Sequence, residues 1–127
     1  MNSGCANKEA RVERIDGGQA IPLSLKLESM SGTRDGESVT AAPLFSNGVD
    51  SVRMDLDLRL GPPITFVSGS YRADVGGHTS EGPVICDSLS FQGGQTALPS
   101  VGGLFRLQDS DGHTVYRVSL PSTQIFR

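Results

Sequence analysis

The chain lacks several features that mark common classes of protein. Its 127 residues include no tryptophan, two tyrosines and five phenylalanines, so an aromatic platform for stacking nucleic-acid bases or sugars has little to be built from. The formal charge is −3 and the pI is near 5.2, whereas a nucleic-acid partner requires a basic face. No hydrophobic run approaches the ~18 residues of a membrane-spanning helix. We therefore expect no nucleic-acid partner.

Long segments with the 3.6-residue period of a helix are also missing, and 16 glycines and 7 prolines would interrupt them. The period is two instead, most clearly in residues 52–60, where apolar side chains alternate with charged ones; we expect Met54, Leu56 and Leu58 to be buried. Strands are expected at residues 11–16, 21–28, 39–45, 52–60, 64–75, 84–91, 104–108 and 115–120, with Gly, Pro, Asp and Asn turns between them. About eight short strands predict an all-β fold, a single-domain β-sandwich or cracked small β-barrel with little or no helix.

Cysteine is scarce, and one of the two copies stands near the start of the chain. Ser3-Gly4-Cys5 matches the end of a bacterial lipoprotein signal peptide, where small residues precede the cysteine that receives diacylglycerol. Asn2 stands where a leucine is usual, and the basic and apolar regions of a signal peptide are missing. We therefore expect Cys5 to be the lipidation site, in a chain that starts where a signal sequence has been removed.

Two other interpretations of Cys5 stay open. It could form a disulfide with Cys86, or it could be an ordinary thiol. Because a disulfide also requires an oxidising compartment, an envelope location follows from either lipidation or a disulfide. We divide the chain into residues 1–9, a lipobox remnant and flexible tether, and residues 10–127, a single β-rich domain.

Paired carboxylates are the first candidates for catalysis. Asp55 and Asp57 lie two residues apart on one face of an expected strand, within about 7 Å of each other, and glycoside hydrolases use such pairs. Arg53 and Arg59 flank them on the same face. We interpret the four side chains as a charge-balanced, solvated stripe.

Metal ligands are the second candidates. Residues 109–112, Asp-Ser-Asp-Gly, resemble the start of a calcium loop, but Leu120 occupies the twelfth position, where glutamate is required. A β-hairpin turn explains the segment more simply. His78 and His113 lie in predicted turns and are expected to be exposed; a metal site would require the fold to bring them together with further ligands.

Nucleophiles are the third candidates. Cys86 stands in an apolar run and is expected to behave as a small buried hydrophobic residue, with no adjacent base to activate it. Since no complete catalytic set is present, we expect no enzyme activity, no cofactor and no metal.

The N-terminal motif and the strand pattern together resemble the small outer-membrane pilotin lipoproteins of bacterial type III secretion systems, the YscW type. The resemblance covers the chain from Cys5 to about Val75. It rests on Ser3-Gly4-Cys5, Arg11-Val12-Glu13-Arg14-Ile15, Gly17-Gly18, Ile21-Pro22-Leu23-Ser24-Leu25-Lys26-Leu27-Glu28, an alternating strand before Gly61-Pro62-Pro63, and Tyr71-Arg72-Ala73-Asp74-Val75.

This resemblance implies a β-rich protein whose lipid anchors it in the inner leaflet of the outer membrane. It would carry a secretin subunit there and promote assembly of the secretin ring. Only Cys5 matches the family residue by residue, and the residues that contact the secretin are not indicated. The family's lipid- or peptide-holding cavity is associated with a helix that interrupts a cracked barrel, and this sequence has no amphipathic helix pattern, which argues against an internal lipid cavity.

We therefore expect a non-enzymatic pilotin that holds the C-terminal segment of its secretin by strand addition at a sheet edge or in a groove. The alternative is a periplasmic lipoprotein that carries a ligand or carbohydrate in a barrel cavity. The scarcity of aromatic residues counts against that alternative.

Overall fold

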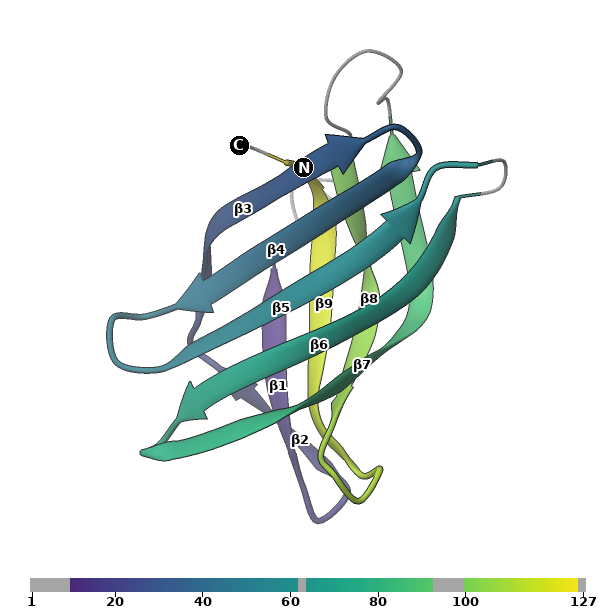
Figure 1. The fold of residues 1–127 in the computed structure, drawn as a ribbon. Helices are drawn as coiled ribbons and strands as arrows, with labels where there is room; N and C mark the ends of the chain where they lie inside the picture. The colour runs from purple at the N-terminus through teal and green to yellow at the C-terminus, as the bar shows by residue number, and fades with distance from the viewer. Residues whose placement is uncertain (1–9, 62–63, 93–99, 126–127) are drawn as a thin grey trace, which may run out of the picture.

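The computed structural model describes residues 10–61, 64–92 and 100–125. These residues form nine antiparallel strands in the order β2-β1-β9-β8-β7-β6-β5-β4-β3, and they contain no helix that could cross a membrane (Figure 1). The expected all-β fold is confirmed. The strands are β1 Arg11–Asp16, β2 Gln19–Leu23, β3 Lys26–Asp35, β4 Ser38–Ser46, β5 Ser51–Arg59, β6 Thr65–Val75, β7 His78–Gln92, β8 Ser100–Gln108 and β9 Thr114–Gln124.

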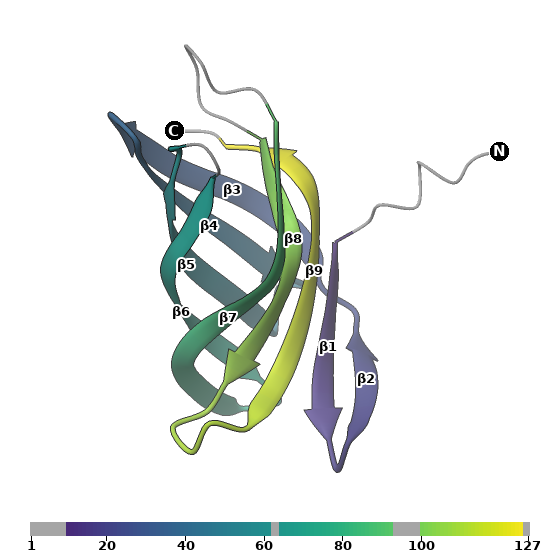
Figure 2. The ribbon, with the colours of Figure 1, turned by 90° about the vertical axis from the view of Figure 1, so that its right-hand side faces the viewer.

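Strand β7 folds the sheet over on itself. Residues 78–83 pair with β6, whereas residues 84–92 pair with β8. One layer therefore contains β2, β1, β9, β8 and the second part of β7, and the other contains β3 to β6 with the first part (Figure 2). The result is a curled half-barrel whose two terminal strands, β2 and β3, do not pair with each other.

The core lies between the two layers and follows from the alternating pattern. In β5, Met54, Leu56 and Leu58 are at most 2% exposed, while Asp55 and Asp57 face solvent. The predicted orientation of this strand is confirmed. Apolar side chains from the strands of both layers fill the core together with Ile125, which follows β9. The largest fully buried ones are Phe45, Phe105, Met30, Met54, Leu56, Leu58, Leu107, Ile125, Val12, Val39, Val52 and Val101.

Two hairpins close through glycine pairs. Gly17 and Gly18 join β1 to β2 with φ values of 60° and 86°, and Gly76 and Gly77 join β6 to β7 with φ values of 61° and 80°. Two successive residues with positive φ form the type I′ turn, whose twist matches that of the flanking strands. Both pairs stand where the sequence predicted turns.

One predicted strand is wrong. Residues 21–28 form the end of β2 and the start of β3, with a break at Ser24 and Leu25. Leu25 donates its backbone N–H to the carbonyl of Leu23 at 3.0 Å and turns its side chain into the core. Ile21, one of the alternating apolar residues of that predicted strand, is 36% exposed because β2 is an edge strand paired only with β1.

Several strands are longer than predicted. Strand β7 begins at His78 rather than at residue 84, so His78 is its exposed first residue and does not lie within a turn. Strand β8 begins at Ser100 and β9 continues to Gln124. Residues 29–35, for which no strand was predicted, complete β3.

We predict that Gly82→Ala destabilises the fold where β7 crosses between the layers. A Cβ at residue 82 would collide with the backbone carbonyl oxygen of Gln108, which cannot swing away as a side chain can. Overpacking of this kind costs about 1 to 3 kcal/mol, measurable by urea unfolding. Gly61→Ala is the control, because its nearest contact would be the Glu37 carboxylate at 3.7 Å; equal losses from both variants would contradict the close packing at Gly82.

Candidate partner-binding edge

The ten-residue strand β3 ends the sheet, and among the described residues no strand pairs with its outer side. A two-residue turn joins β3 to β4, so its flanking residues, Asp35 and Ser38, form a hydrogen-bonded pair. Because such pairs alternate along an antiparallel ladder, Met30 and Gly32 direct their backbone N–H and C=O groups away from β4. An extended chain can therefore approach a long edge at β3.

The other terminal strand, β2, is a poorer template for pairing. It is only five residues long and contains Pro22, which lies opposite Glu13 of β1. The Gly17-Gly18 turn makes Asp16 and Gln19 a hydrogen-bonded pair, and alternation from there turns the Pro22 nitrogen toward the outer edge. Proline has no N–H to donate, and a short edge strand with proline resists strand addition.

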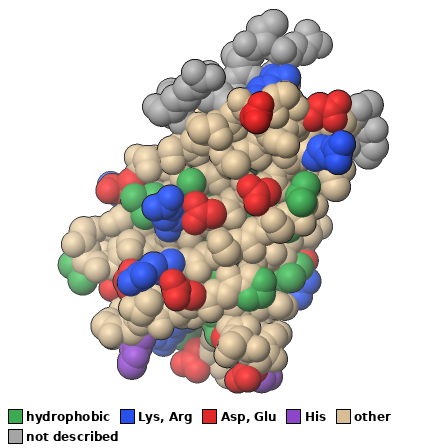
Figure 3. Space-filling model, in the orientation of Figure 1, with side chains coloured by type: hydrophobic (Ala, Val, Ile, Leu, Met, Phe, Trp, Pro, Cys, Tyr) green, Lys and Arg blue, Asp and Glu red, His purple; other side chains and the backbone are tan. Residues whose placement is uncertain are grey.

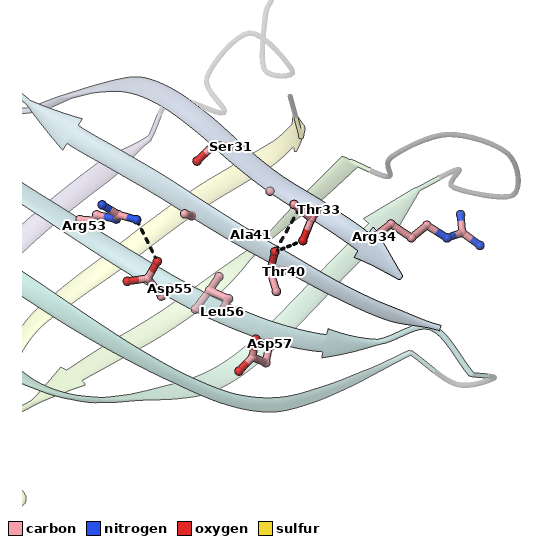
Figure 4. A pocket seen from close by; sticks show the side chains of 11 residues that line it. Ser31, Thr33, Arg34, Thr40, Ala41, Arg53, Asp55, Leu56 and Asp57 are labelled. Atoms are coloured by element: carbon pink, nitrogen blue, oxygen red, sulfur yellow. Dashed lines mark hydrogen bonds and ion pairs between the residues drawn. The ribbon is translucent and has the colours of Figure 1, made fainter. Parts of the chain in front are cut away.

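An open trough of about 850 Å³ lies on the outer face of β3, β4 and β5, beside the edge (Figure 4). The trough is open because several side chains of β3 and β4 that line it are small: Ser31, Thr33, Thr40 and Ala42. Thr33 and Thr40 face each other across the two strands, with their hydroxyl groups 2.8 Å apart, and the Thr33 backbone N–H donates to Thr40 Oγ1 at 3.0 Å.

The floor of the trough lies over a gap in the ladder between β4 and β5. The pairing runs as far as Ala41 with Leu56 and resumes at Leu44 with Arg53. Pro43 stands in the gap, and a proline cannot donate a backbone hydrogen bond to β5. Ala42, which has a small side chain, lines the trough at this gap.

The charged stripe on β5 is confirmed and forms one wall of the trough. Arg53 binds Asp55 at 3.3 Å, and Asp57 accepts a hydrogen bond from the Ser68 hydroxyl at 3.2 Å. Figure 3 shows acidic and basic side chains interspersed on this face. The Arg53 and Asp55 side chains are both more than half exposed, so water screens their interaction. Asp55 and Asp57 are therefore exposed groups on the surface of a strand.

The segment from Asp109 to His113 is the predicted hairpin turn. Asp109 Oδ1 accepts hydrogen bonds from the backbone N–H groups of Asp111 at 2.9 Å and His113 at 3.0 Å. Oxygen and nitrogen atoms of these three side chains lie within 4.8 Å of one another, the one such group found among the described residues, and it does not include His78. Since Asp109 already organises the turn, the cluster is explained by local structure.

Of the two cysteines, the structure describes Cys86 and does not describe Cys5. Cys86 is a free, half-buried thiol that packs against the core and donates to the Ser88 carbonyl oxygen at 3.3 Å. Burial, and to a lesser degree the charge of Asp87, raises the pKa of the Cys86 thiol, so little thiolate forms at neutral pH. Asp87 itself is held by Arg106 at 2.9 Å. Cys5, the expected lipidation site, lies outside the described residues, as does the rest of the expected tether, residues 1–9.

The two tyrosines close one end of the core. Their rings are 6.3 Å apart in an edge-to-face arrangement, and the Tyr71 hydroxyl forms a 2.8 Å hydrogen bond with Ser80 Oγ. Burial raises the pKa of both Tyr71 and Tyr116, which keeps the phenols protonated at neutral pH. They are packing residues and not activated nucleophiles.

The small residues of β3 that shape the trough were not predicted, because no strand was expected at residues 29–35. The available signal was the run of small side chains from Ser29 to Thr33, which is interrupted only by Met30.

Comparison with protein-family profiles, curated proteins and solved structures finds no match to this chain.

Proposed function

We propose that this protein is a lipid-anchored pilotin that binds the C-terminal segment of a secretin subunit, brings it to the outer membrane and promotes assembly of the secretin ring. The lipid on Cys5 provides the membrane affinity, since several acyl chains give stable anchoring. The β-domain provides the binding site and catalyses no change in its partner. The resemblance of residues 5–75 to YscW-type pilotins supports this assignment.

The observation that carries the proposal is the long, accessible edge of β3 beside the trough. Strand addition gives affinity through backbone hydrogen bonds and specificity through the alternate side chains of the added strand. On the outer face, the added side chains would lie next to Ser31 and Thr33, where the trough leaves room. Those on the inner face would extend the core past Gly32.

The expected affinity of the isolated domain is close to micromolar. A flexible segment loses conformational entropy when it becomes ordered as a strand, and this cost offsets part of the interaction. In the envelope, the lipid anchor holds protein and secretin at one surface, which raises their effective concentration. Modest intrinsic affinity is therefore compatible with efficient delivery.

We predict that bulky charges beside the β3 edge prevent delivery of the secretin. The double substitution Ser31→Lys and Thr33→Lys places two long cationic side chains on exposed positions of the edge, a device that blocks strand addition in natural sheets. Fractionation of cells that carry this variant should find the secretin largely lost from the outer membrane, although the variant itself remains folded and anchored.

Ser70→Lys is the matched control, because Ser70 is exposed on β6 in the interior of the same layer. It should leave secretin localisation unchanged. Correct localisation with the double variant, or an equal defect with Ser70→Lys, would contradict binding at β3.

A further inference from the structure

The C-terminal end of the described chain closes the core beside β3. Strand β9 ends at Gln124, and Ile125 follows it. Ile125 is only 2% exposed and belongs to the hydrophobic core. A Cβ built on Gly32 would lie 2.6 Å from Ile125 Cγ2. The Ile125 side chain therefore occupies the space directly over Gly32.

A strand added at the edge of β3 would place one side chain next to that space. In an antiparallel sheet, side chains of directly opposed residues lie next to each other on one face. Gly32 pairs with Ala41 of β4 on one side and has no strand partner on the other among the described residues. Since Gly32 has no side chain of its own, a slot for one apolar side chain is left at the edge, and Ile125 fills it without being part of a strand.

We propose that this slot is the anchor point of the β3 edge, and that an aliphatic side chain of the bound secretin segment takes the place of Ile125. This inference rests on the proposed function and names the partner's chemistry: an extended segment with a side chain of isoleucine, valine or leucine size opposite Gly32. Ile125 shows what the slot accepts, an uncharged, branched aliphatic group. Ile125 is thus a competitor within the same molecule.

Competition between Ile125 and the secretin segment lowers the apparent affinity of the domain for that segment by a factor that can be estimated. If a site is accessible only in a minor conformation, the measured Kd is the intrinsic Kd divided by the accessible fraction. Minor states are commonly populated at about 0.1 to 10%. Removal of the Ile125 side chain should therefore tighten binding by roughly 10- to 1,000-fold, although it also removes core packing and lowers the melting temperature of the free domain.

The test compares three proteins by titration calorimetry with overlapping synthetic peptides that span the C-terminal segment of the cognate secretin. Ile125→Ala should bind the active peptide at least about 10-fold more tightly than the unaltered domain. Val49→Ala, which also shortens an aliphatic side chain but at a position 88% exposed, should bind like the unaltered domain. Changing the anchoring aliphatic residue of the peptide to aspartate should abolish binding to all three.

A second measurement needs no variant. The Ile125 methyl signals of the unaltered domain should move on peptide addition to the positions of a solvent-exposed isoleucine. Binding of the peptide with static Ile125 signals, or with no gain from a folded Ile125→Ala variant, would overturn the exchange but leave the pilotin function intact. If no peptide binds to the unaltered domain, the proposed function is wrong and the exchange falls with it.

Discussion

Replacing Leu56 with alanine should lower the free energy of unfolding by about 2 to 5 kcal/mol, the usual loss when a buried leucine is truncated. Leu56 is 1% exposed at the centre of β5, and its Cδ2 packs close to Gly69 of the adjacent strand β6. Truncation would leave a cavity between the two layers. Against a typical total stability of about 5 to 15 kcal/mol, this is a large fraction.

Asp55→Ala is the control for Leu56→Ala, one position away on the opposite face of the same strand. Its pair with Arg53 is exposed on both sides, and such pairs contribute up to about 1 kcal/mol. Urea unfolding of the two variants should therefore give clearly different midpoints. Equal shifts would mean that β5 does not present Leu56 to the core.

Replacing Cys5 with serine in the full-length precursor should abolish lipidation completely. Serine has no thiol to receive diacylglycerol, so metabolic labelling with a fatty acid should give no labelled protein. Cell fractionation should then find the protein released from the outer membrane. The unaltered precursor should reach the outer membrane, because Ala6 and Asn7 follow the cysteine and a sorting aspartate for inner-membrane retention is missing.

The matched control for Cys5→Ser is Cys86→Ser, which removes the other thiol of the chain. It should retain both the label and the membrane association. A Cys5→Ser precursor that still carries label and stays membrane-bound would show that the anchor is elsewhere. Loss of labelling only with Cys86→Ser would exclude the lipobox interpretation of Ser3-Gly4-Cys5.

Strands with one buried and one solvated face could be predicted from the sequence. The alternation of β5 is complete from Val52 to Arg59, because a shift by one residue would bury its charges. The same pattern extended too far at residues 21–28, since Leu23, Leu25 and Leu27 keep the period of two across the break at Ser24. The periodicity of a sequence indicates which side chains are apolar, but it does not indicate where one strand ends and the next strand, with a different pairing partner, begins.

Features that depend on long-range pairing could not be predicted. Strand β7 starts at His78 with polar residues because its first part packs on β6 near the edge of the core, a placement that no local pattern encodes. The edge position of β3 follows from the order of all nine strands. The contact between Gly32 and Ile125 joins residues far apart in the chain, and neither residue is part of a recognisable motif.

The most direct test of the central claim is titration of the unlipidated domain with peptides from the C-terminal segment of the cognate secretin. We expect heat of binding for one contiguous peptide, a one-to-one stoichiometry, a Kd near micromolar, and recovery of the peptide chemically unchanged. Absence of both heat and co-purification with the secretin, together with stoichiometric binding of a fatty acid or a sugar, would contradict the pilotin function and identify the protein as a periplasmic carrier.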